Sequence, residues 1–98
     1  MGAHHRFFVA LDIQHEGHGP CVEWLEQHDA IPVFPGLWLL KKFQGHAGDI
    51  KHRLDQECPD IPLFVIAVAP QNDFAGHLLP VSVLRELELM QRPPRVVL

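Results

Sequence analysis

The chain has 98 residues, which suits one folded domain and leaves no room for a second core. Twelve aspartates and glutamates outnumber eight lysines and arginines, and the resulting net charge of −4 argues against nucleic-acid binding through a broadly basic surface. The hydrophobic fraction of 47% includes no apolar run near the ~20 residues of a membrane span, and no secretory signal pattern is visible, so we expect a globular cytoplasmic protein.

The first predicted elements are a strand and a helix. Phenylalanine, valine and isoleucine dominate residues 6–13, which predicts a strand over 6–13 with Asp12 near its exit. The following loop is rich in glycine and leads to Pro20, a residue favoured in the first turn of a helix. Apolar residues at helical spacing then predict a helix over 20–29.

A hairpin is predicted next. Pro35–Gly36 matches the two central positions of a type II turn, which would join strands over 31–34 and 37–43. Pro32 cannot donate a ladder hydrogen bond, so the strand over 31–34 is expected at an edge of the sheet.

The pattern of elements predicts the fold. A helix over 47–57 and an apolar strand over 63–69 follow the hairpin. The order strand, helix, strand, strand, helix, strand is typical of the ferredoxin-like βαββαβ sandwich, an α+β fold in which strands 1 and 3 are central and both helices cover one face. We therefore expect a single domain with a core over about residues 6–70.

The strands are apolar on both faces, whereas two helices cover only one. The second face must therefore meet the C-terminal extension, about residues 78–98, or another subunit. The extension predicts a helix followed, after Pro93–Pro94, by "RVVL", which suits pairing with the edge of the last strand in its own or a second chain. We expect a C2 homodimer that joins sheet face to sheet face. The predicted interface residues are Trp38, Leu40, Phe64, Ile66, Val96 and Val97.

The cysteines and the basic residues predict no specific chemistry. Cys21 and Cys58 form no CxxC unit and lie in apolar helical patterns, which predicts buried thiols rather than a disulfide. Four basic residues offer a local patch, but solvated side chains are the preferred interpretation: Lys41, Lys42, Lys51 and Arg53.

Histidines are frequent, with eight in the chain. His15 and His18 lie in the loop after Asp12, where they are candidates for zinc binding or proton transfer. No CxxC or HExxH unit accompanies them, so solvated loop histidines are the preferred interpretation. His4 and His5 are set aside because they resemble a cloning remnant.

Asp12 is the leading candidate for a functional side chain, with two interpretations open. A hard cation such as Mg²⁺ or Mn²⁺ is often held by one or two carboxylates, which two Asp12 side chains would supply across a dimer axis. Alternatively, the carboxylate hydrogen-bonds to backbone groups of the loop that follows the strand, a common use of aspartate in turns.

Four segments carry a family resemblance: "RFFVALDI", "PGLWLLKKF", "AGDIKHRL" and "IPLFVIAVA". From Arg6 to about Gly76, the chain resembles the small SinR-like proteins, which belong with the virulence-associated protein D ribonucleases and the second core adaptation protein of CRISPR systems. The resemblance implies a ferredoxin-like homodimer in which Asp12 helps to hold a divalent metal for phosphodiester cleavage. The chain departs from catalytic relatives in being acidic and in lacking a basic or aromatic motif for gripping nucleic acid.

Two functions of different class follow. The favoured one is a non-catalytic dimeric module that binds a protein, because the chain is acidic, its sheet is heavily apolar, and only Glu16 offers a second carboxylate near Asp12. The alternative is a metal-dependent nuclease or endoribonuclease that uses Asp12 as its catalytic metal ligand.

Overall fold

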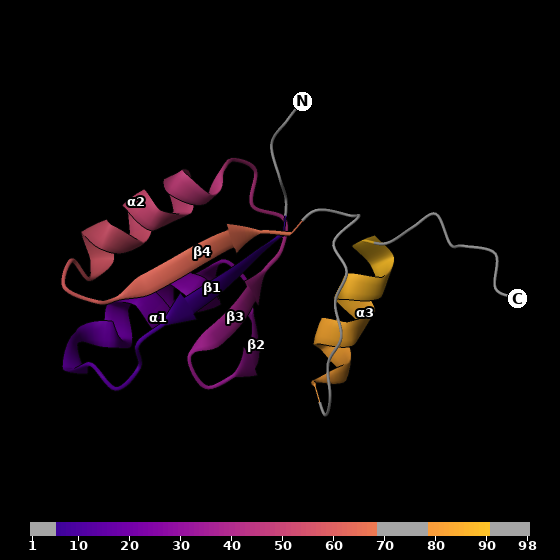
Figure 1. The fold of residues 1–98 in the computed structure, drawn as a ribbon, viewed down its shortest axis with the longest axis horizontal. Helices are drawn as coiled ribbons and strands as arrows, with labels where there is room; N and C mark the ends of the chain where they lie inside the picture. The colour runs from indigo at the N-terminus through magenta and orange to yellow at the C-terminus, as the bar shows by residue number, and fades with distance from the viewer. Residues whose placement is uncertain (1–5, 69–78, 91–98) are drawn as a thin grey trace, which may run out of the picture.

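In the part of the chain that the structure describes, a four-stranded antiparallel sheet with three α-helices forms a small α+β domain (Figure 1). The computed structural model describes residues 6–68 and 79–90. Within these residues, no helix has the length and apolar character that crossing a membrane requires. The elements are β1 (Phe7–Leu11), the 3-10 turn η1 (Glu16–His18), α1 (Gly19–Gln27), β2 (Ile31–Phe34), β3 (Leu37–Leu40), α2 (Ala47–Glu57), β4 (Leu63–Ala67) and α3 (Val81–Met90).

The strand order is β2-β3-β1-β4, so β1 and β3 are central and β2 and β4 are the edges. All three pairings are antiparallel. Pro32 lies on edge strand β2, where its missing N–H leaves no gap in a central ladder. The β2–β3 pairing also contains an irregularity between Pro32 and Phe34.

Local backbone chemistry sets the ends of the hairpin strands. Gly36 has φ 90°, the left-handed conformation that the third position of a type II turn requires. Its carbonyl accepts a hydrogen bond from the Leu11 N–H at 2.8 Å, and a Cβ at Gly36 would lie only 3.0 Å from the Leu11 carbonyl oxygen. At the other end, β3 stops at Leu40, shorter than the predicted 37–43, because Lys42 turns the chain with φ 68°.

The main hydrophobic core lies between the sheet and the pair α1 and α2, which cover the same face (Figure 1). Side chains at alternate positions of β1 and β3 meet apolar side chains of both helices. The buried residues of this core are Phe7, Val9, Leu11, Cys21, Trp24, Leu25, Trp38, Leu40, Ile50, Leu54, Cys58 and Ile61.

A smaller cluster lies on the opposite face, where α3 stands beside β2 (Figure 1). Val83 and Leu87 of α3 are buried against Val33, Leu39 and Val68. An ion pair between Arg6 and Glu86 joins the start of β1 to the helix. Of the two alternatives for the second face, the C-terminal extension therefore covers part of it through α3. Val96 and Val97, and the predicted "RVVL" strand, lie outside the described residues.

The expectation of free cysteines was wrong. A disulfide links Cys21 of α1 to Cys58 at the end of α2, with their Cα atoms 6.1 Å apart. Both residues are buried in the main core. Sequence spacing separates them by 37 residues, and only the side-by-side packing of α1 and α2 brings them together.

Candidate functional site

The part of the second sheet face that α3 leaves uncovered carries exposed apolar side chains. We call this surface the open face. Three large apolar side chains are exposed on it: Phe34 at 55%, Phe64 at 62% and Ile66 at 48%. Scattered apolar residues on a protein surface are ordinary, but a contiguous group marks an interaction site. The open face comprises Ala10, Phe34, Phe64 and Ile66, together with Phe8 and Leu37, which are partly buried and border the α3 cluster.

Cross-strand register makes these residues contiguous. Ala10 of the central strand pairs with Phe64 on one side and with Leu37 on the other. Leu37 in turn pairs with Phe34, so one row of apolar side chains crosses the whole sheet. Phe8 pairs with Ile66 in the next row. No charged side chain interrupts these two rows between β4 and β3.

The predicted interface residues divide between the two faces of the sheet. Phe64 and Ile66 lie on the open face, as a contact surface requires. Trp38 and Leu40 lie on the helix-covered face, where they are 8% and 0% exposed within the main core. A partner that contacts Phe64 therefore cannot also contact Trp38, because the sheet and the two helices stand between them.

Asp12 lies at the exposed end of central strand β1, in a turn. Its carboxylate oxygen Oδ1 accepts a hydrogen bond from the Gln14 N–H at 3.1 Å, and its carbonyl accepts one from the His15 N–H at 3.2 Å. The Asp12 N–H continues the sheet ladder by donating to the Pro62 carbonyl at 3.1 Å. This is the turn geometry that aspartate commonly stabilises.

The surroundings of Asp12 are apolar rather than rich in ligands. In the parts of the chain that the structure describes, no three acidic, histidine or cysteine side chains come together as a metal site would require. Asp12 instead borders a shallow hollow of about 310 Å³ with Ala10 and Phe64, at the rim of the open face. Among the described residues that line this hollow, Asp12 is the single carboxylate, and a metal site would need a second copy of the chain or a substrate phosphate to complete it.

The two loop histidines make local backbone contacts. The His15 ring atom Nδ1 accepts from the Gly17 N–H at 3.4 Å and caps η1. The His18 ring atom Nδ1 lies 2.7 Å from the His15 carbonyl oxygen, which can only accept, so this nitrogen carries a proton. The rings therefore hold the loop together, and they do not converge on one point as zinc ligands do.

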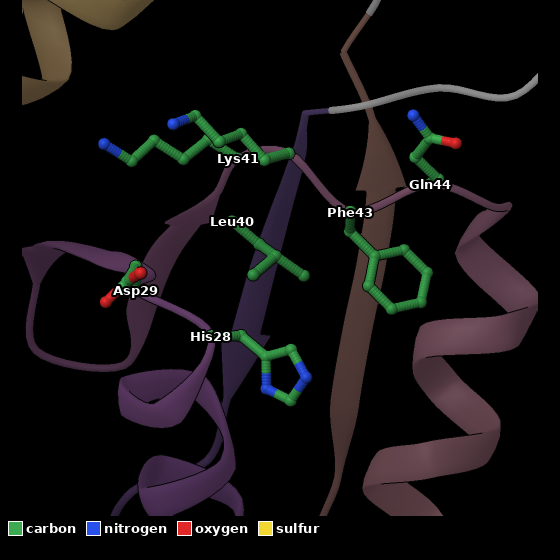
Figure 2. Close-up of a pocket in the computed structure, with 7 residues that line it drawn as sticks. His28, Asp29, Leu40, Lys41, Phe43 and Gln44 are labelled. Atoms are coloured by element: carbon green, nitrogen blue, oxygen red, sulfur yellow. The ribbon is translucent and has the colours of Figure 1, made fainter.

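A separate hollow of about 530 Å³ opens between the end of α1 and the loop after β3. Figure 2 shows His28, Leu40 and Phe43 around it, with Lys41 extending away from the Phe43 ring. The His28 ring stacks on Trp24 with centroids 4.0 Å apart, and its Nδ1 lies 2.9 Å from the Trp24 carbonyl oxygen. Asp29 is exposed at the rim. Sequence reasoning missed this hollow, because its walls come from two segments that meet only in the fold.

The four basic residues of the local patch do not act together. Lys51 forms an ion pair with Asp55 one helical turn later, and the Arg53 guanidinium lies 5.9 Å from the centroid of the Trp24 ring. Lys41 and Lys42 stand at the hollow after β3. Two of the four charges are thus already engaged within the domain, which weakens a nucleic-acid surface further.

No protein-family model, curated protein or solved structure matches this chain. The open face therefore stands as the candidate site on its geometry alone. Sequence reasoning found Phe64 and Ile66 and missed Phe8 and Phe34. Alternation within each strand was visible, but the register that sets these four side chains on one face was not.

Proposed function

We propose that this chain is a homodimeric, non-catalytic module that binds protein through its open face. One observation carries the proposal: three large apolar side chains, each about half exposed or more, lie in adjoining rows on a sheet face. Water contact with such a group is unfavourable by about 25 cal/mol per Å² of apolar surface, so binding that covers it is driven by the hydrophobic effect.

We further propose that the domain is ferredoxin-like. The strand order β2-β3-β1-β4 and the placement of α1 and α2 over one face support this assignment. In such a layout the second face is available for binding. Here α3 covers the part of this face around Val33, Leu39 and Val68, whereas Phe34, Phe64 and Ile66 stay exposed.

The second candidate function is a metal-dependent nuclease of the virulence-associated protein D and CRISPR adaptation type. Its source is the family resemblance, and one observation supports it: Asp12 is exposed at the end of a central strand, on the rim of the surface proposed to contact other chains. A Mg²⁺ or Mn²⁺ ion bound there would polarise a phosphate and activate a water. The apolar surroundings of Asp12 and the net charge of −4 make this the second choice.

A photo-crosslinking experiment tests the module directly. Benzoylphenylalanine replaces Phe34 on the open face or, as a control, Glu23 on the exposed side of α1. In the native host, position 34 should give discrete protein adducts that position 23 does not give. If neither position crosslinks, or if both positions crosslink to the same extent, the open face is not a specific protein-binding surface.

A cleavage assay with Asp12→Asn separates the two functions. Labelled single- and double-stranded RNA and DNA are incubated with Mg²⁺, Mn²⁺ or chelator at low salt. We expect no cleavage above background from either the parent protein or the variant. Asparagine keeps the oxygen that accepts from Gln14, so the fold is retained and any loss of activity reports on the charge. Cleavage by the parent protein that is lost with chelator and also lost in Asp12→Asn would contradict the non-catalytic module and support the nuclease function.

A further inference from the structure

Among residues 6–68 and 79–90, no other strand pairs with the outer edge of β4. The Val68 N–H donates to the Arg6 carbonyl, and the Asp12 N–H donates to the Pro62 carbonyl. These two bonds show which facing residues of the β1–β4 ladder are hydrogen-bonded pairs. In an antiparallel ladder the bonded residues alternate, so Phe64 and Ile66 direct their N–H and C=O groups toward β1. The same groups of Leu63, Val65 and Ala67 point outward. No residue in 6–68 or 79–90 forms a backbone hydrogen bond with these outward groups.

The two edges of the sheet differ in their protection. On β2, Pro32 pairs with Trp38 at a position where its nitrogen faces outward, so this edge lacks a donor. The irregularity beside Pro32 and the contact with α3 protect the same edge further. Strand β4 has none of these features: all five of its residues are apolar, and none is charged or proline. An unprotected apolar edge of this kind pairs readily with another strand.

The β4 edge is complementary to itself. With a two-fold axis at Val65, Val65 faces Val65 of the partner subunit, and Leu63 faces Ala67 of the partner subunit. These are the three residues whose backbone groups point outward, so every outward group on both strands finds a partner. Between them, Phe64 comes opposite Ile66 of the partner subunit on the open face, an aromatic–β-branched pair of the kind that stabilises sheets. No like charges meet, although each chain carries a net charge of −4.

There is also room for a strand beside β4. A groove of about 300 Å³ runs between α2 and β4, lined by Ala47, Gly48, Lys51 and the first three residues of the strand. Two of these α2 residues are the smallest available, and a Cβ added at Gly48 would meet nothing within 4 Å. Side chains of an added strand that point to the helix side can therefore enter this groove.

We infer that the β4 edge is the homodimer contact, and that two copies pair antiparallel through β4 about an axis at Val65. This inference rests on the homodimer of the proposed function and names its contact. The product is one continuous eight-stranded sheet. The two open faces then lie side by side around the central Phe64 and Ile66 pairs. Dimerisation in this way enlarges the open face for a protein partner instead of burying it.

A cysteine trap tests the register. In a hydrogen-bonded antiparallel pair the Cβ atoms are about 5.5 Å apart, which is long for a direct disulfide, so a short bis-methanethiosulfonate reagent should link the two thiols of a Val65→Cys dimer. Ala67→Cys is the matched control, because its side chain lies on the same face of the same strand. It would stand about 13 Å along the strand from its own copy and should not crosslink. Non-reducing electrophoresis reads the result. A failure of Val65→Cys to crosslink, or equal crosslinking by both variants, overturns the inference.

Removing the central donor tests the hydrogen bonds. Val65→Pro deletes an N–H that points away from β1, so the intramolecular ladder is kept. The dimer loses both bonds of its central pair, and its dissociation constant in sedimentation equilibrium should rise about 30-fold, since each bond contributes roughly 1 kcal/mol. Should the proline prevent folding, the cysteine trap still decides the question.

Phe34→Ser distinguishes edge pairing from face pairing. Phe34 lies on β2, at the opposite side of the sheet from β4, so this variant should leave the edge dimer intact while weakening partner binding. If Phe34→Ser dissociates the dimer and Val65→Pro does not, the homodimer stands but its contact is the open face, and the β4 inference fails. If the parent protein is monomeric at every concentration, the β4 inference and the homodimer of the proposed function both fail.

Discussion

Replacing Asp29 with glycine is expected to stabilise the protein, although it removes a charged side chain and adds a flexible residue. Asp29 follows α1 with φ 60°, the left-handed conformation that side chains other than glycine rarely adopt. Its N–H donates to the Glu26 carbonyl at 3.1 Å, and the Ala30 N–H donates to the Leu25 carbonyl at 2.9 Å. These two bonds form a Schellman motif, in which this position is usually glycine.

The expected gain follows from three contributions to the free energy of unfolding. A side chain in the left-handed conformation costs about 1 kcal/mol through crowding of its Cβ. A carboxylate beside the negative end of the helix dipole costs about 0.5 kcal/mol more. Glycine has more conformational freedom in the unfolded chain, and this reduces the gain in the free energy of unfolding by about 0.5 kcal/mol. The net gain is about 1 kcal/mol, or a rise in Tm of about 5 °C for a domain of this size.

Urea and thermal unfolding measure the effect, with Asp29→Asn as the matched control. Asparagine tolerates the left-handed conformation about as well as aspartate, so it should recover only the electrostatic part, about 0.5 kcal/mol. A free energy of unfolding for Asp29→Gly that is equal to or below that of the parent protein would contradict this expectation. That result would mean that the Asp29 carboxylate makes a stabilising contact at the rim of the hollow shown in Figure 2.

One further variant and one chemical treatment test the packing of the helices. Leu87→Ala should lower the free energy of unfolding by about 3 kcal/mol, because Leu87 is only 2% exposed and alanine leaves a cavity. Urea titration measures this change, and a loss below about 0.5 kcal/mol would show that α3 is not docked in solution. Reduction of the Cys21–Cys58 disulfide should lower the same free energy by up to about 4 kcal/mol, since it closes a loop with a sequence separation of 37. Thiol titration and urea unfolding with and without dithiothreitol check this, and identical transitions would contradict it.

Several elements are determined by the sequence alone, because local chemistry decides them. Strand β2 over 31–34 and helix α2 over 47–57 have the predicted bounds. Pro35–Gly36 requires a particular turn, and Pro32 is poorly tolerated in a central strand, so the hairpin and its edge position follow from residue type. Strands β1, β3 and β4 are apolar on both faces, whereas two helices cover only one face. The sequence therefore also predicts that another segment or another subunit contacts the second face.

Tertiary structure alone decided which side chains share a face. Alternation in a strand divides its side chains between the two faces of the sheet. Which of these two sets shares a face with a given set of the neighbouring strand depends on the register of the pairing. Trp38 pairs with Val9 and turns into the main core, whereas Phe64 pairs with Ala10 and faces outward. The same limit hid the disulfide, because helix packing and not sequence spacing brings its two cysteines together. It also hid that the backbone N–H and C=O of Val65 point away from β1. This orientation follows only from the hydrogen bonds at the two ends of the β1–β4 ladder.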